Sequence, residues 1–288
     1  MGARLFRRFV RLNTSSEQFV GEGVSFKTPS FRIGFDVLYK SSSRPNKAKV
    51  MIWNLNEQSI EILARPLAVA TLIAGYKGTT GKPGYKGTII KGDIVSLDTV
   101  GKGEDKITTI EVKNAGILYR TARYDTSFAG PISNGAILKD IITQFNLGTG
   151  FGTTAIPELI YPEGVTFCGP LRTALDELIV EDLEGEWSIV DGNLQILLGD
   201  DVPTNQGDFL LNKNTGLIRA KRKKKAVEMT CLMLPDMRPG RFLQLQSEQI
   251  KGFYVARTVQ FKGDGYEASQ RFQTIIKARI LHGAEVVG

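Results

Sequence analysis

Two short motifs decide the fold, because they recur at one fixed spacing: Lys86-Gly87 with Thr109-Ile110, and then Lys251-Gly252 with Thr274-Ile275. Both motifs are displaced by 165 positions (251 minus 86, and 274 minus 109). A pattern that returns at a constant displacement is typical of a duplicated structural unit. We therefore expect two similar β-sheets, one near the front of the chain and one near the rear, and no enzyme with a single pocket.

Alternating apolar and polar residues around these motifs predict β-strands. The run 89–97 follows the first motif and the run 254–261 follows its counterpart, and a turn of glycines and charged residues ends each run. A short helix is expected over 56–63, with Asn56 as its cap and Pro66 at its end. We expect a five-stranded front unit that ends near residue 125. The remaining expected strands cover 31–39, 48–55, 69–74, 107–114, 227–234, 242–246 and 272–280.

The middle of the chain has helical spacing instead. Apolar residues between 137 and 145 predict a helix that begins at the Ser133/Asn134 cap and ends at Gly148, and a second helix is expected over 171–179. Asp191-Gly192 between alternating apolar residues predicts a hairpin. The expected architecture is mainly β with an α+β insertion. Its domains are a first β-barrel over 1–125, a small α+β domain over 126–214 and a second β-barrel over 215–288.

The composition is that of a globular multidomain protein. The chain has 288 residues, a net charge of +7, 42% hydrophobic residues and 23% charged residues. Its longest apolar stretch, 67–74, is far shorter than the roughly 20 residues that span a bilayer, so no membrane crossing or export signal is expected. Cys168, Cys231 and the single His282 lack metal-ligand spacing. We expect two buried, reduced thiols and neither metal nor cofactor.

The segment 75–87 is rich in glycine and lysine but is not a phosphate-binding loop. Its glycine spacing is one residue too long for a P-loop, and Pro83 stands where the motif needs a hydroxyl. The glycines of 148–152 lack the dinucleotide-binding spacing. The lysines of the first segment, Lys77 and Lys82, are instead candidate interface residues.

The densest charge run, 221–225, supplies the other candidate interface residues: Lys221, Arg222, Lys223, Lys224 and Lys225. Five like charges in a row resist packing, so we expect an exposed loop. This loop could bind the phosphates of a nucleic acid, which is one alternative function. A solvated loop, or a docking patch for an acidic protein surface, is favoured over this alternative, because no stacking aromatic residues are interleaved with the run.

Acidic residues crowd the segment 176–186, and a pair of them could act as the acid and base of a polysaccharide-degrading enzyme, the second alternative. The favoured interpretation is the solvated face of the second helix. No nucleophile, base and orienting group come together in the sequence, so no catalytic residue is predicted and the chain is not expected to be an enzyme. The acidic residues are Asp176, Glu177, Glu181, Asp182, Glu184 and Glu186.

The order of these units resembles the baseplate hub proteins of contractile-tailed bacteriophages. The resemblance implies two tail-tube-like barrels per chain, so that a homotrimer forms a pseudo-hexameric ring between the sixfold tail tube and the threefold spike. It also implies that DNA passes through the channel without specific binding. The motifs that carry it are 48–56, 74–76, 171–178, 187–192, 215–218, 232–240, 252–255 and 262–264.

The same resemblance implies the partners and the location. The partners are further copies of the chain, the tail tube protein and the central spike protein, with baseplate wedge and tape measure proteins as additional candidates. The expected location is the tail baseplate of the virion, after assembly in the cytoplasm of the host bacterium.

Overall fold

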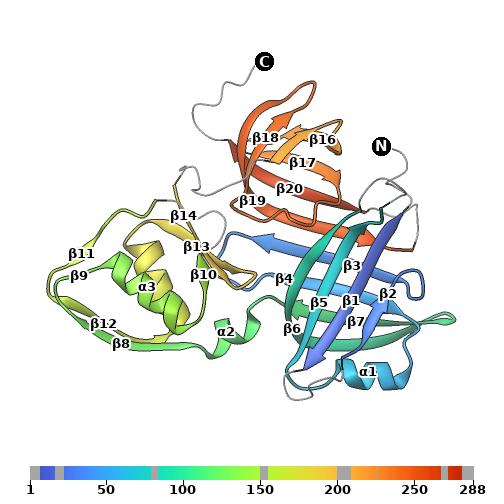
Figure 1. Cartoon of the computed structure of the whole chain (residues 1–288), viewed down its shortest axis with the longest axis horizontal. Helices are drawn as coiled ribbons and strands as arrows, with labels where there is room; N and C mark the ends of the chain where they lie inside the picture. Colours follow the sequence, from blue (N-terminus) through green and yellow to red (C-terminus); the bar gives the residue numbers. More distant parts are fainter. Residues whose placement is uncertain are drawn as a thin grey trace.

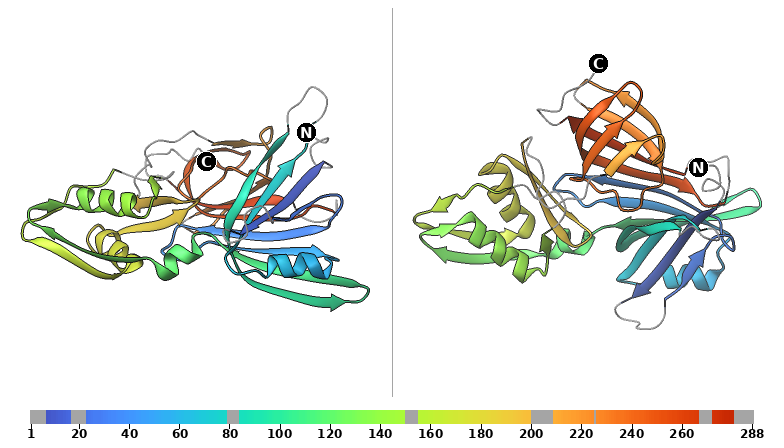
Figure 2. Two further views of the ribbon diagram at one scale, coloured as in Figure 1. Left: turned by 60° about the horizontal axis from the view of Figure 1, so that its bottom comes forward. Right: turned by 45° about the horizontal axis from the view of Figure 1, so that its top comes forward.

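The computed structural model describes residues 7–16, 23–78, 84–149, 155–199, 209–224, 226–266 and 272–280. Strands dominate, which confirms the prediction of a mainly β protein. Three parts are visible in Figure 1: a front half (β1 to β7 with α1) on the right, a rear half (β15 to β20) above it, and a smaller middle unit on the left. The two views of Figure 2 keep the middle unit to one side of the large sheet.

The front half begins with a strand that the sequence pattern did not predict. The strand β1 pairs with both β2 and β5, so the front unit has more than the five expected strands. Asn56 caps α1 as predicted, because its side chain accepts a hydrogen bond from the Ser59 amide. The elements are β1 (Arg8–Ser16), β2 (Ser25–Lys27), β3 (Ile33–Lys40), β4 (Lys47–Trp53), α1 (Glu57–Leu63), β5 (Ala68–Tyr76), β6 (Tyr85–Lys102) and β7 (Asp105–Lys113).

The rear half contains the second set of predicted strands. On β20 the side chains of Thr274, Ile276 and Ala278 are buried while Lys277 and Arg279 are exposed, as the alternation of that segment predicts. The elements are β15 (Phe209–Asn212), β16 (Leu217–Arg222), β17 (Val227–Leu232), β18 (Phe242–Gln246), β19 (Lys251–Asp264) and β20 (Gln273–Ile280).

Both halves belong to one 13-stranded sheet. Its order is β16-β17-β20-β19-β3-β4-β7-β6-β5-β1-β2, with β18 paired to β19 and β15 paired to β18. The halves join where residues 258–264 of β19 pair antiparallel with residues 34–40 of β3. No closed barrel is found in the described residues, so the two expected barrels, and the domain boundaries drawn from them, stay predictions.

The two halves repeat the same topology. The front strands lie in the order β3-β4-β7-β6-β5 and the rear strands in the order β16-β17-β20-β19-β18, with every neighbouring pair antiparallel. Each half also has a register shift at the same place. Val95 is the extra residue of β6 where that strand faces Val112, and Arg257 is the extra residue of β19 where it faces Ala278.

The constant displacement of 165 residues does not, however, relate equivalent positions. Val112 of β7 and Ala278 of β20 are equivalent positions, because each lies opposite its neighbouring strand at the register shift. They are separated by 166 residues (278 minus 112). Ile110 is buried while Ile275 is only half-buried, because the motif shifted by one residue points to the other face of its strand. The inference of a repeat is therefore supported by topology, and the motif alignment that suggested it is wrong.

One hydrophobic core fills both halves, and a second core lies in the middle unit. The first contains residues from each half, such as Phe35 and Val50 in front and Met229 and Ile276 in the rear. Tyr39 of β3 packs edge-on against Phe261 of β19 at the junction, with ring centroids 6.2 Å apart. Because this core is shared, we expect the two halves to unfold together.

The middle unit is an α+β arrangement packed around its own core. Tyr119 fixes α2 to β13: its ring stacks on Trp187 at 5.7 Å, and its hydroxyl accepts a hydrogen bond from the Ile189 amide. Burial raises the pKa of Tyr119 to about 12. The elements are α2 (Gly116–Thr121), β8 (Arg123–Ala129), β9 (Ile132–Ser133), α3 (Asn134–Gln144), β10 (Gly148–Thr149), β11 (Ile160–Tyr161), β12 (Gly164–Pro170), α4 (Leu171–Leu175), the π-helix η2 (Asp176–Glu181), β13 (Gly185–Val190) and β14 (Asn193–Leu198).

Helix and turn signals in this unit are confirmed with one exception. Ser133 caps α3 through a hydrogen bond from the Ala136 amide, and the Asp191-Gly192 turn joins β13 to β14 with both residues at positive φ. Gly148 does not end α3. The helix ends at Gln144, Asn146 takes the left-handed conformation, and Gly148 begins β10, which pairs parallel with β14.

Candidate assembly surface

The face of the large sheet that points away from the core is polar. Asp36 of β3 accepts a hydrogen bond from the Gln260 side chain at 2.6 Å, and its other oxygen lies 2.9 Å from the Lys262 ammonium. These contacts cross from β19 to β3, so they fasten the outer side of the junction between the halves. A hollow of about 490 Å³ continues across this face, lined by Asp36, Leu38, Lys47, Ala48, Lys49, Ser96, Asp98, Thr109, Glu111 and Gln260.

The basic run is only partly a loop, which corrects the sequence interpretation. Lys221 and Arg222 end β16, and Lys223 and Lys224 form the turn into β17. All four are exposed, as expected, because β16 lies at the end of the sheet order. The Lys223 ammonium lies 4.0 Å from the Glu228 carboxylate, a weak surface contact. Lys225 lies outside the described residues.

The other candidate interface residues belong to the front half. Lys77 follows β5 directly, is exposed, and donates its amide to the carbonyl of Arg7 at 2.8 Å. Lys82 lies outside the described residues. The structure thus places Lys77 and the basic run on different halves of the sheet, and it does not bring them together into one binding site.

Several strands of the large sheet have an edge without a strand partner in the described part of the chain, among them β2, β15, β16 and the end of β6. The strand β16 pairs with β17 on one side alone. Residues 96–102 of β6 pair with β7, whereas β5 reaches only residues 85–93 on the opposite side. The edges of β6 and β16 each present a large exposed apolar side chain, Val100 at 56% and Ile218 at 59% exposure. Unpaired strand edges of this kind favour pairing with another chain.

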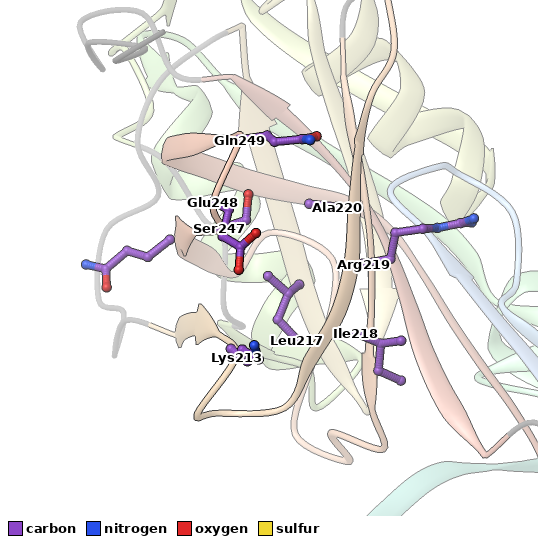
Figure 3. Close-up of a pocket in the computed structure, with 9 residues that line it drawn as sticks. Lys213, Leu217, Ile218, Arg219, Ala220, Ser247, Glu248 and Gln249 are labelled. Carbon is purple, nitrogen blue, oxygen red and sulfur yellow. The ribbon is translucent and has the colours of Figure 1, made fainter.

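A groove runs beside the β16 edge (Figure 3). It has a volume of about 570 Å³ and is lined by Lys213, residues 217–220 of β16 and residues 246–249. In the figure Leu217 points toward Ser247, whereas Arg219 points away from it. The lining offers one carboxylate, Glu248, and a Ser247 hydroxyl that is hydrogen-bonded to the backbone of Ile250 at 2.8 Å.

A buried arginine links three parts of the molecule, and the sequence interpretation missed it. Arg238 is 6% exposed and donates from Nε to Asp191 at 2.6 Å. Its Nη1 donates to the carbonyls of Pro235 and Met237, and its Nη2 donates to the carbonyl of Thr88 at 2.8 Å. The rear half, the hairpin of the middle unit and β6 of the front half therefore meet at one side chain.

Tyr39 completes this junction. Its hydroxyl donates to the carbonyl of Ile89 at 2.9 Å and lies 3.2 Å from Asp191, and the Arg238 guanidinium lies 4.9 Å from its ring centre. Burial raises the pKa of Tyr39, so the phenol stays protonated and able to donate. Four hydrogen bonds from Arg238, together with those of the Tyr39 hydroxyl, give the cluster a structural role, since buried polar groups without partners are costly. A lone arginine within the proline-rich turn 235–240 was its only sequence signal.

The acidic segment of the middle unit is held in structural contacts. Asp176 accepts a hydrogen bond from the Trp187 indole at 2.8 Å, and Asp182 accepts one from the Tyr161 hydroxyl. Glu186 forms an ion pair with Arg257 at 3.0 Å, which ties the middle unit to β19. Partial burial and the nearby carboxylates of Asp182 and Glu181 raise the pKa of Glu177.

One of the two thiols differs from the prediction of buried cysteines. Cys231 is buried and its burial raises the pKa of the thiol, whereas Cys168 is exposed because it faces outward on β12. Among the described residues no group of His, Cys, Asp and Glu side chains could hold a metal ion. The helices in the described ranges are all too short or too polar to cross a membrane.

Comparison with known proteins shows a shared fold. No protein-family model and no curated protein sequence matches the chain. Among solved structures, the 43 kDa tail protein of prophage MuSo2 from Shewanella oneidensis matches with a TM-score of 0.60 at 8% identity, over 96% of this chain and all (100%) of that one. A tail protein from Neisseria meningitidis MC58 matches with a TM-score of 0.57 at 10% identity, over 96% and 97%.

A third match comes from a secretion machine. It is a component of the type VI secretion system of E. coli, described as structurally similar to the T4 bacteriophage tail proteins gp27 and gp5, with a TM-score of 0.54 at 10% identity, over 88% of this chain and 73% of that one. These likenesses show that the chain shares its fold with tail proteins. Because all three identities are so low, they show the fold alone.

Proposed function

We propose that this chain is a structural baseplate hub of a contractile phage tail. In this role three copies form a pseudo-hexameric ring that joins the sixfold tail tube to the threefold spike. The observation that supports it most directly is the repeated strand order of the front and rear halves, with the extra residues Val95 and Arg257 at corresponding places. Two similar modules per chain let three chains supply six similar positions around one axis.

The fold shared with the structural neighbours supports the same role, and so does the polar outer face of the large sheet. Each half contributes strands to this one sheet. A polar face of mixed charge suits a water-filled channel through which DNA passes without specific binding. The tail tube protein and the central spike protein are the proposed axial partners, with wedge and tape measure proteins as further candidates. The proposed location is the virion baseplate, after assembly in the host cytoplasm.

Sedimentation and imaging of the purified full chain test this proposal. We expect a species of three times 31.7 kDa whose electron-microscopy averages show a ring of six similar lobes around a channel. A chain that stays monomeric at high concentration, or whose averages lack a channel, contradicts the proposal. The polysaccharide-degrading alternative is tested separately with Glu177, Glu181 and Glu186 all replaced by alanine. Any such activity that survives the triple replacement does not come from this cluster.

A further inference from the structure

We infer that the unpaired edge of β6 in one copy binds the β16 edge of a second copy, as an antiparallel strand pair in a defined register. Residues 98–102 of β6 pair with residues 219–223 of the second copy. This inference rests on the proposed function, because it names the contact by which the hub subunits join.

The template for this contact exists inside the chain. At the junction of the halves, β19 pairs with β3 so that Lys262 lies opposite Asp36 and Phe261 lies opposite Val37. This junction uses the part of β19 that follows the extra residue Arg257 and extends beyond β18, which reaches only Val255. It therefore joins the overhang of one half to the outer edge of the other.

The topological repeat places equivalent strands at the unpaired edges. In the hairpin β6–β7, Leu97 lies opposite Ile110, and in the hairpin β19–β20, Val259 lies opposite Ile276, so the overhang of β6 corresponds to the overhang of β19. On the other side β16 corresponds to β3, since each is the outer neighbour of an equivalent strand, β17 or β4. The front half thus has an overhang without a partner, and the rear half has an outer edge without one.

Transferring the internal register defines the contact residue by residue. Lys262 corresponds to Val100, because they lie opposite the equivalent residues Gln273 and Ile107. Asp36 corresponds to Lys221, because they lie opposite the equivalent residues Lys49 and Glu228. The register places these residues of the first and second copy opposite each other: Asp98 and Lys223, Thr99 and Arg222, Val100 and Lys221, Gly101 and Ala220, and Lys102 and Arg219.

Charge supports this register. In the internal junction an acid on β3, Asp36, binds the ammonium of Lys262 on β19 at 2.9 Å. Between copies the signs are exchanged: Asp98 of β6 lies opposite Lys223 and diagonal to Lys221, a neighbourhood within reach of long side chains. The one like-charged pair, Lys102 with Arg219, lies at the end of the ladder. The exposed basic run thereby gains one carboxylate, that of Asp98, as its partner.

The contact is heterologous, because the two edges that meet are different surfaces of the chain. Such contacts close into a ring when the rotation between copies divides a full turn, and otherwise form an open helix. Pairing also removes two exposed strand edges and covers Val100, which is 56% exposed in the single chain. A second copy is therefore the occupant that the edge geometry and the charges favour.

Cysteine cross-linking of the full chain tests the register. Val100→Cys with Lys221→Cys, made in a Cys168→Ser background, should form a disulfide between copies under a mild oxidant and give ladder bands up to a covalent trimer on non-reducing gels. Facing positions across two strands come within the range that a disulfide needs. The matched positive control is Lys262→Cys with Asp36→Cys, which should cross-link within one chain.

A register control and sedimentation separate the possible outcomes. Val100→Cys with Arg222→Cys should not cross-link, because residue 222 points to the other face; cross-linking there in place of the 221 pair overturns the register. A trimer that sediments normally while only the internal control cross-links overturns this inference and leaves the hub proposal standing. A monomer overturns both.

Discussion

Replacing Arg238 with methionine should lower the free energy of unfolding by about 3–5 kcal/mol, the usual cost of breaking an ion pair at its buried member. The Arg238 side chain is 8% exposed, whereas that of its partner Asp191 is 35% exposed. Methionine fills much of the same space, so the loss comes mainly from polar groups. The substitution leaves the carbonyls of Pro235, Met237 and Thr88 without this donor. Each buried group left unpaired costs about 1–3 kcal/mol, and relaxation around the site keeps the sum within the stated range.

The control for this prediction is an ion pair with less burial. The side chain of Arg257 is 21% exposed and its partner Glu186 is 55% exposed, so Arg257→Met should cost about 1 kcal/mol or less. Urea unfolding at one fixed protomer concentration, followed by the fluorescence of Trp53 and Trp187, measures both variants on the same scale. Equal losses for the two variants would refute the view that Arg238 holds the three parts of the molecule together.

Three further outcomes are expected. A thiol reagent should modify Cys168 in the folded protein but reach Cys231 only after unfolding, as mass spectrometry with and without denaturant will show. The pKa of Glu177 is raised in the folded protein, so the folded state binds this proton more tightly than the unfolded state does. The free energy of unfolding should therefore rise as the pH falls through the raised pKa. Glu177→Gln should stabilise the protein at neutral pH and reduce that rise, as melting curves recorded at several pH values will show. Lys221→Glu with Lys223→Glu should disrupt assembly, and we expect no tight DNA binding either before or after the substitutions. If fluorescence anisotropy shows a salt-dependent DNA affinity that the substitutions remove, the nucleic-acid alternative is favoured.

Local signals in the sequence predicted local structure well. The side chain of Asn56 and the turn Asp191-Gly192 act within a few residues of chain, so their neighbours in sequence are also their neighbours in space. The strand β1 carries a comparable local signal, the alternation of Val10, Leu12 and Thr14, all of which are buried.

The functional surface depends on pairings that no local pattern contains. The partner of β19 is β3, a strand more than 200 residues away in the chain, and alternation specifies which face of a strand is buried but not which strand lies beside it. Exposure of the basic run was predictable from its charge. Its place on a sheet edge was not, because strand residues at an edge are exposed for the same reason as loop residues.

In the inferred register, the charges at the two kinds of junction also disfavour wrong pairings. A rear-half overhang placed on the β16 edge of another copy would set Lys262 opposite Lys221, two like charges in direct contact. A front-half overhang placed on β3 of another copy would set Asp98 diagonal to Asp36. Alternation of front and rear halves places an acid beside a base at each kind of junction, Lys262 against Asp36 inside the chain and Asp98 against the basic run between chains. The charges thus supply a reason for the two halves, alike in topology, to differ in sequence at their edges.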